Sequence, residues 1–482
     1  MTKLPAARAT LAALSGAALL SACSLAPTYQ RPAAPVAATF PADSVGAAAR
    51  TSVPLPLAAN ARTAVDTGWR DYFPEPRLQS LIAAAQENNR DLRTAVLRIE
   101  EARALYNVQS ADRLPNLNAS VADTRAKTPA FLSSTGVSTI GKRYDVGVSV
   151  SSFELDFFGR VKSLSDAALS TYLATDEARM AAQIALVAQV AQAYYTERAY
   201  AEQYALAQQT YEARARTYQL TQQRAEVGAS SRLDLRSNET LMETARAAAL
   251  ALARQRAQAE NALTLLVGQA PASAAAGALP DARQLDNMSA LPAGLPSDLL
   301  IRRPDIRAAE LRLKAANANI GAARAAFFPR ISLTAALGSS SPSLHGLFDS
   351  GSGSWSFAPQ LTLPIFDAGR NRANLTLAEV RNNLAVADYE KTIQTAFREV
   401  ADALAARDYL GEQEAAQRAV QEAQADRLKL LQLRFDNGVA SSLDVLDAQR
   451  ELFSAQQSLV QVRLLRTTTA IDLYRALGGG LQ

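Results

Sequence analysis

The stretch Arg434–Arg450, RFDNGVASSLDVLDAQR, decides the fold because the chain contains a second copy of it. Residues Arg224–Thr240, RAEVGASSRLDLRSNET, align with it without a gap at an offset of 210 residues. The shared positions are Arg224 with Arg434, Gly228 with Gly438, Ser231 with Ser441, Leu233 with Leu443, and Asp234 with Asp444. Because the match continues along the following helix, a whole arm of helix, turn and helix is duplicated. The sequence therefore predicts two tandem structural repeats.

Two of the positions at which the copies differ are singled out. In the alignment, Asp447 and Arg450 of the second copy correspond to Ser237 and Thr240 of the first. Since the surrounding turn is shared, these two residues mark the place where the second repeat is expected to differ in function.

Long helices are predicted on both sides of each turn. Four stretches rich in Ala, Gln, Glu, Arg and Leu lack both Pro and Gly: residues 161–227, 229–267, 371–410 and 439–477. These residue types are strong helix formers. A helix over the first stretch spans roughly 100 Å, which exceeds the size of a compact domain. Tyr204, Tyr211 and Tyr218 recur every seven residues, so this helix is expected to form a coiled coil with the helix over 231–267.

Composition excludes several classes of function. The formal net charge is +4 over 482 residues, and charges of both signs alternate along the helices, so no nucleic-acid partner is expected. Cys23 is the only cysteine and His345 the only histidine. The chain therefore has no intramolecular disulfide, and no histidine-rich metal site or cofactor is expected.

The N-terminus carries the features of a lipoprotein signal. Residues 1–22 contain a basic start, an apolar run too short to span a bilayer, and small residues before Cys23. Leu20–Cys23, LSAC, resembles a bacterial lipobox, which implies a lipid on Cys23, and Ser24 after it suggests the outer membrane. The Pro- and Ala-rich segment that follows, within 23–68, is expected to be an extended strap.

Each repeat also contains a predicted β-hairpin. The first covers residues 115–154 and the second 329–364, and in both the apolar residues alternate with small or polar ones. Such segments are typical of membrane strands with the apolar side facing outward. The alternative is an amphipathic hairpin on a soluble domain, which the recurrence at the same place in both repeats makes less favourable. Pro359 is expected to break or bend its strand.

These elements give the expected domain boundaries. The first repeat covers 69–269 and opens with one helix over about 77–112. A Pro- and Ala-rich linker occupies 270–296, the second repeat covers 297–478, and 479–482 form a short tail. Four strands cannot close a sheet in lipid, because an open edge leaves backbone groups unsatisfied. A dimer provides eight strands, with an interior that side chains fill, whereas a trimer provides twelve and leaves a passage.

Several motifs, in this order, resemble the outer membrane factor family of TolC-like channels, and specifically its lipoprotein branch. They are the lipobox, LPSDLLIRRPDIRAAE (295–310), AAFFPRISL (325–333), LTLPIFDAGR (361–370), FREVADAL (397–404), SSLDVLDAQRELFSAQQSLV (441–460) and ALGGG (476–480). The resemblance covers nearly the whole chain after Cys23.

The resemblance implies a mainly α protein with membrane β-structure and two tandem repeats. Its trimer would form a 12-stranded outer-membrane β-barrel, continued by a 12-helix α-barrel in the periplasm. The implied partners are a periplasmic membrane-fusion adaptor protein and an inner-membrane pump of the resistance-nodulation-division class. Drug efflux is the implied activity, with metal-ion efflux or secretion of other small molecules as alternatives.

In such channels the helical hairpins converge at the periplasmic tip and close it. The resemblance therefore places the turns of Gly228 and Gly438 at the entrance. The residues just behind these turns form the predicted periplasmic gate: Asp234, Leu443, Asp444, Asp447 and Arg450. The hypothesis is that Leu443 forms an apolar constriction, and that Asp447 and Arg450 form a polar latch between hairpins.

Each gate assignment has a simpler alternative. Asp234 and Asp444 both lie three residues after a serine, so either can complete a capping box at the start of a helix. Asp447 can form a local pair with Arg450 at a spacing of three, worth only about 0.2 to 0.5 kcal/mol.

Two other classes of function compete with a channel. A lipid-anchored periplasmic coiled-coil scaffold leaves the four alternating strands unexplained. An enzyme using Asp444 and Asp447 as a carboxylate pair lacks a positioned base, so the chain is not expected to be an enzyme.

Overall fold

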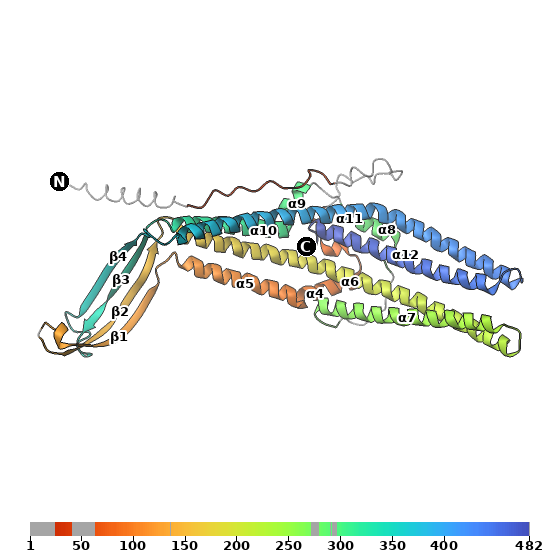
Figure 1. The fold of residues 1–482 in the computed structure, drawn as a ribbon, viewed down its shortest axis with the longest axis horizontal. Coiled ribbons are helices and arrows are strands. Elements are labelled where there is room, and N and C mark those ends of the chain that lie inside the picture. The colour runs from red at the N-terminus through yellow and green to blue at the C-terminus, as the bar shows by residue number, and fades with distance from the viewer. Residues whose placement is uncertain are drawn as a thin grey trace. The chain divides into compact units, whose positions relative to one another are not determined.

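The computed structural model describes residues 25–40, 63–134, 136–270, 279–289, 291 and 296–481 (Figure 1). Cys23 and the predicted signal over 1–22 lie outside these residues. The chain divides into two compact units. Unit 1 comprises residues 1–33, 98–176 and 308–390, and unit 2 comprises 34–97, 177–307 and 391–482.

The helices follow the duplication seen in the sequence. Their bounds are α3 (Trp69–Tyr72), α4 (Pro76–Asn88), α5 (Arg90–Ala111), α6 (Arg160–Glu226), α7 (Arg232–Val267), α8 (Ala282–Ser289), α9 (Pro296–Arg302), α10 (Pro304–Ala325), α11 (Arg370–Asp436) and α12 (Ser442–Ala476). Helices α6 and α11 each contain 67 residues and begin 210 residues apart, which confirms the repeat. Among the described residues, no helix combines the length and apolar character needed to cross a membrane.

The single helix predicted over 77–112 is wrong, because Asn89 divides it into α4 and α5. Asn89 has an extended backbone with φ −64° and ψ 129°. Its side-chain oxygen accepts a hydrogen bond of 2.9 Å from the backbone N–H of Leu92, and its amide donates one of 2.9 Å to the carbonyl of Leu266. A cap for α5 and a contact with the end of α7 thus replace the continuous helix.

The core of unit 2 joins both repeats. Tyr72 stacks on Tyr474 with ring centroids 4.0 Å apart. Trp69 and Phe73, which lie close to Tyr72 in the sequence, are also buried. The expected pairing of α6 with α7 is confirmed by Tyr204, which packs on a buried cluster. The members of this cluster are Ala207 of α6 and Ala249 and Leu252 of α7, with Tyr200 and Phe453 also packed against it.

Unit 1 contains a four-stranded antiparallel sheet in the order β1–β2–β3–β4 (Figure 1). The strands are β1 (Leu117–Thr128), β2 (Thr139–Leu155), β3 (Arg330–Ser341) and β4 (Gly353–Thr362), and a short 3₁₀ helix, η1 (Ala130–Leu132), lies between β1 and β2. The register pairs Val121 with Val146, Val148 with Leu337, and Leu337 with Trp355. Because side chains alternate across a strand, this register places the apolar residues of all four strands on one face.

This face of the sheet, the apolar face, is exposed. Its large exposed side chains are Leu117, Val121, Val148, Leu337, Trp355, Phe357 and Leu361. The opposite face, the polar face, carries small or polar residues such as Ser120 and Ser354, which the register connects through Gly147 and Gly338. The alternation predicted from the sequence is therefore confirmed.

Two details of the sheet differ from expectation. Pro359 does not break β4 but pairs with Leu333 within it, and β4 is an edge strand of this sheet, where a missing N–H is tolerated. Strand β2 also continues past Phe153 to Leu155 through a bulge after Val150. Ser152, with φ of +51°, lies in this bulge.

The described part of the predicted strap, residues 25–40, has no regular secondary structure. Within unit 1, Arg31 forms a 2.8 Å ion pair with Glu310 of α10, and Asn317 donates a 2.8 Å hydrogen bond to the carbonyl of Pro27. Within unit 2, Phe40 stacks on Phe397 with ring centroids 5.0 Å apart. Specific contacts therefore hold this extended segment on the helices.

Candidate functional site

The two hairpin turns of unit 2 have the same backbone geometry. Gly228 has φ of +73° and Gly438 has φ of +74°, a left-handed conformation that is unfavourable for residues with a Cβ. In the first turn Ala229 N–H donates to the carbonyl of Arg224 at 2.7 Å, and in the second Val439 N–H donates to Arg434 at 2.8 Å. Both turns lie at the same end of their helix pairs (Figure 1).

The serine after each turn caps the next helix. Ser231 accepts a hydrogen bond of 3.0 Å from the backbone N–H of Asp234, and its hydroxyl donates to that carboxylate at 2.7 Å. Ser441 and Asp444 make the complete capping box, since the Ser441 N–H also donates to the Asp444 carboxylate at 3.0 Å. Both aspartates thus have a structural role in the hairpin that contains them.

Capping also determines the ionisation of these carboxylates. Hydrogen bonds from the Ser231 hydroxyl hold the pKa of Asp234 below its ordinary value, and a bond from Ser442 adds to the effect. Hydrogen bonds from the side chain and then the backbone of Ser441 likewise lower the pKa of Asp444. Both groups are therefore anionic at neutral pH.

A residue that the sequence did not single out connects the two hairpins. The hydroxyl of Ser442 donates a 3.2 Å hydrogen bond to Oδ1 of Asp234. Ser442 is the first residue of α12, whereas the aligned position of the first repeat is Arg232, the first residue of α7. Among the described residues, no equivalent hydrogen bond from Arg232 to Asp444 is seen.

Asp447 and Arg450 form a pair within α12. Arg450 contacts Asp447 at 2.5 Å and Glu451 at 3.2 Å. Arg427 of α11, a second residue that the sequence did not suggest, contacts the other carboxylate oxygen of Asp447 at 3.3 Å. The ion pairs seen for Asp447 thus lie within α12 and between the two helices of the second hairpin.

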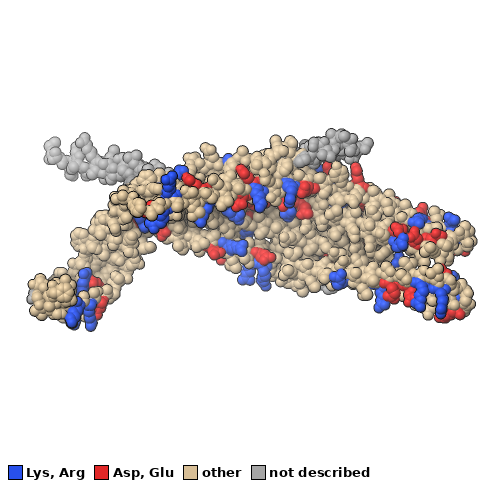
Figure 2. Space-filling model, viewed as in Figure 1, with Lys and Arg blue, Asp and Glu red and all other residues tan. Residues whose placement is uncertain are grey.

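Apolar side chains are exposed around both turns. Leu443 is 68% exposed, and the aligned Leu233 is 77% exposed. Val227 and Val439, within the turns themselves, are exposed as well. Charged side chains of both signs surround these ends in the space-filling view (Figure 2). The tips consequently present apolar residues within a charged rim.

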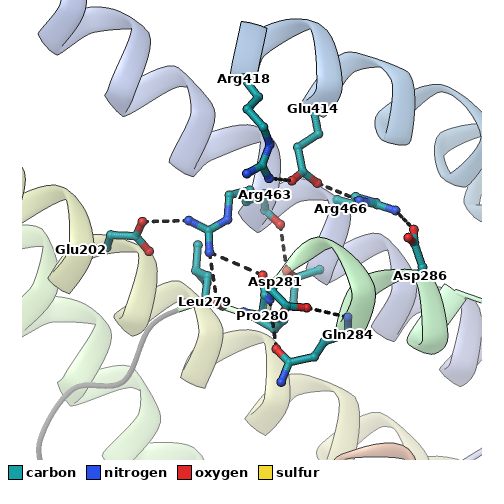
Figure 3. A network of polar contacts seen from close by, with 11 residues as sticks. Glu202, Leu279, Pro280, Asp281, Gln284, Asp286, Glu414, Arg418, Arg463 and Arg466 are labelled. Carbon is teal, nitrogen blue, oxygen red and sulfur yellow. Dashed lines mark hydrogen bonds and ion pairs between the residues drawn. The ribbon is translucent and has the colours of Figure 1, made fainter. Parts of the chain in front are cut away.

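A second polar cluster lies in the linker between the repeats, where sequence analysis predicted no site (Figure 3). Arg463 of α12 contacts Glu202 of α6 at 2.8 Å and donates to the carbonyl of Leu279 at 3.1 Å. Arg466 contacts Glu414 of α11 at 2.8 Å and also pairs with Asp286 of α8. These residues, which we call the linker clamp, fasten residues 279–289 to helices of both repeats.

The linker clamp contains a carboxylate that is nearly fully buried. The side chain of Glu414 is 3% exposed and also contacts Arg418 at 2.7 Å. Burial raises the pKa of Glu414, but hydrogen bonds from Arg466 and Arg418 outweigh burial and hold it below its ordinary value. Glu414 is therefore a buried anion that two arginines neutralise.

Comparison with known proteins identifies the family. The outer membrane efflux protein family model matches residues 81–269 and 295–479. The chain is 49% identical to outer membrane protein OprJ of Pseudomonas aeruginosa over 471 residues, 98% of this chain and 95% of that protein. It is 48% identical to the toluene efflux pump outer membrane protein TtgC of Pseudomonas putida over 463 residues, 96% of this chain and 93% of that protein.

A solved structure agrees with these matches. The open state of the Neisseria gonorrhoeae MtrE outer membrane channel superposes with a TM-score of 0.83 at 43% identity, covering 95% of this chain and 99% of that one. The resemblance inferred from the sequence motifs is thereby confirmed: the chain belongs to the outer membrane efflux protein family.

Proposed function

We propose that the chain forms the outer-membrane exit duct of a tripartite efflux pump and conducts small molecules passively to the exterior. The observation that carries this proposal is the register of the four strands, which places apolar residues from every strand on one exposed face. A soluble protein rarely exposes a contiguous apolar face of this kind, whereas a sheet in lipid requires one.

The working unit of this duct is a homotrimer. Strands β1 and β4 are the two edges of the protomer's sheet. In lipid these edges need partners, because unsatisfied backbone groups cost several kcal/mol each. Three copies supply twelve strands, enough to close the sheet around a passage.

The hairpin tips are the docking surface for a periplasmic adaptor protein, through which the duct couples to an inner-membrane pump of the resistance-nodulation-division class. The exposed Val227, Leu233 and Val439 support this assignment, since apolar side chains within a polar rim are typical of interaction surfaces.

The same tips form the periplasmic gate. Leu443 supplies an apolar constriction, while Asp234, Asp444, Asp447 and Arg450 supply the polar contacts that hold neighbouring hairpins. Support comes from the exposure of Leu443 and from the Ser442–Asp234 hydrogen bond, which already joins the two hairpins of one protomer. Because Asp447 pairs with Arg450 inside α12, a latch between hairpins requires these side chains to exchange partners.

A lipid on Cys23 anchors the N-terminus in the outer membrane. The lipobox LSAC supports this assignment. Pro27 and Arg31, which contact Asn317 and Glu310 of α10, lie within ten residues of Cys23. The permeants are drugs or other small organic molecules, by analogy with the relative named for toluene efflux.

Insertion and conductance test the proposal in one pair of variants. Phe357 lies on the apolar face and Ser356 next to it on the polar face. Phe357→Arg should reduce the amount of folded protein in the outer membrane, because an arginine facing lipid near the midplane costs about 2 to 4 kcal/mol. Ser356→Arg should insert normally and alter single-channel conductance in planar bilayers.

The two variants also separate the duct from a lipid-anchored scaffold. A scaffold has no lipid-facing sheet, so both variants would reach the membrane equally well and the wild-type chain would not conduct. Native mass measurement of the membrane-extracted chain should give three copies, and any other number contradicts the trimer.

A further inference from the structure

The apolar face becomes basic toward the loop end of the sheet. The β1–β2 register is continuous from Leu117 to Thr128, so Arg125 and Lys127 share the face of Val121, and Lys142 shares the face of Val146. All three basic side chains are exposed. Figure 2 shows basic side chains gathered at this end of the sheet. We call these three residues the basic patch.

Two cations of the basic patch lie directly opposite each other. Arg125 and Lys142 are cross-strand partners, and Lys127 is diagonal to Lys142. Like charges in direct cross-strand positions are destabilising. An arrangement that repels itself in water is stabilised when an anion binds between the two charges.

The acidic residues nearby neutralise only part of this charge. Asp123, on the same face, contacts Arg125 at 2.9 Å. Within the described chain, no ion pair is seen for Lys127 or Lys142. Three basic residues and one acidic residue leave the patch with a net charge of +2 by this count.

The polar face at the same level is balanced instead. Arg143, next to Lys142 in the chain but on the opposite side of the strand, contacts Asp145 at 2.8 Å. It also donates to the hydroxyl of Ser340 at 3.1 Å. Uncompensated positive charge is therefore confined to the side of the sheet that continues the apolar face.

The position of the patch indicates its partner. No charged residue lies on the apolar face between Val121 and Leu117 on β1, or between Val146 and Leu155 on β2. This stretch of β2 contains ten residues, the length that crosses a hydrocarbon core at the usual tilt. Tyr144 follows it, as is typical of an aromatic girdle, and the basic patch comes next.

We propose that Arg125, Lys127 and Lys142 form a binding surface for the phosphate groups of a phosphorylated glycolipid in the outer leaflet of the outer membrane. This inference rests on the proposed function, because it requires the apolar face to lie in lipid with the helices on the periplasmic side. Phosphates at headgroup depth would lie between Arg125 and Lys142 and relieve their repulsion.

Titration of the purified full-length protein with lipid A tests this assignment. The probes are lipid A with two phosphates, its phosphate-free form, and phosphatidylglycerol, and binding is measured by native mass spectrometry. The combined variant Lys127→Gln/Lys142→Gln should raise the Kd for lipid A about 30-fold, which corresponds to about 1 kcal/mol for each basic residue. Arg143→Gln should leave the Kd unchanged, because that residue lies on the other face.

Two further readouts make the outcome decisive. In detergent without lipid A, the combined variant should be at least as stable as the wild type, since repulsion is removed. All variants should still conduct in planar bilayers. Equal binding by the combined variant and the wild type, or equal binding of phosphate-free lipid A, would overturn the inference. Stronger binding of phosphatidylglycerol than of lipid A would equally overturn the glycolipid assignment. Loss of wild-type conductance would instead overturn the proposed function.

Discussion

The hydroxyl of Ser442 donates a 3.2 Å hydrogen bond to Oδ1 of Asp234, a residue 208 positions earlier in the chain. It joins the first turn of α12 to the first turn of α7. Asp234 also accepts a hydrogen bond from the hydroxyl of Ser231, so it belongs both to a helix cap and to the contact between hairpins. A single carboxylate therefore couples the local order of one tip to the position of the other.

Replacing Ser442 should loosen the contact between the two hairpin tips without unfolding them. Ser442→Ala removes one partly buried hydrogen bond, worth about 0.5 to 1.5 kcal/mol, and leaves the cap of Ser231 in place. We expect more leakage in planar bilayers and at most a small loss of thermal stability. Ser237→Ala is the control, because Ser237 lies about one turn beyond Asp234 in α7. This variant should conduct as the wild type does. Equal leakage from both variants would remove Ser442 from the gate.

Substitutions at Asp447 and Arg427 should distinguish a role of Asp447 between hairpins from its role within the second hairpin. Asp447→Ala removes an ion-pair partner of both Arg427 and Arg450, whereas Arg427→Gln removes only the contact of Asp447 with α11. If Asp447 acts as a latch between hairpins, Asp447→Ala leaks more than Arg427→Gln.

Leu443→Ala should also leak, because it removes the exposed apolar side chain next to the second turn. Single-channel recording of the closed state measures all three variants. Wild-type leakage from both Asp447→Ala and Leu443→Ala contradicts the gate assignment.

The pH dependence of the tips follows from the two capping aspartates. Their pKa values are lowered from the ordinary 3.8, so their contribution to folding is fully present above that value. It is lost as pH falls through the lower folded-state pKa values. Hydrogen exchange at the turns should therefore be constant in protection between pH 7 and 5, once corrected for intrinsic rates. Loss of protection within that window would show that other groups control the tips.

Replacing glycine by alanine should destabilise the protein at the tip and stabilise it inside the helix. Gly438→Ala places a Cβ at φ of +74° and should destabilise the turn by about 1 kcal/mol. Gly411 lies inside α11, and the nearest atom that an added Cβ would meet is 3.9 Å away. Gly411→Ala should therefore stabilise the protein by about 0.5 to 1 kcal/mol. Denaturant unfolding and hydrogen exchange at the tip measure the two effects.

The linker clamp should depend on its buried arginine. The Arg466 side chain is 12% exposed, and Arg466→Met leaves the buried Glu414 with Arg418 alone, at a cost of about 3 kcal/mol. Asp286→Asn changes an exposed partner and should cost less than about 1 kcal/mol. Denaturant midpoints give the stability, and proteolysis should cleave residues 279–289 faster in Arg466→Met. Equal stability of both variants would mean that the clamp has no role in folding.

Local chemistry made much of the molecule readable from the sequence. Gly228 and Gly438 indicated turns because few other residues adopt positive φ, and Ser231 and Ser441 indicated helix starts because their hydroxyls satisfy nearby N–H groups. The alternation along the strands predicted one apolar face, since each residue's side is fixed by its neighbours in the strand. These features depend on residues a few positions apart.

Tertiary structure alone decided the contacts between distant segments. The break at Asn89 depends on the carbonyl of Leu266, and the coupling of the tips depends on Ser442 and Asp234. The linker clamp likewise brings Arg466 to Glu414 and Asp286. Such partners have no fixed spacing and leave no periodic signal, so the sequence determined the repeats, turns and faces, and only the packed chain determined which polar groups meet.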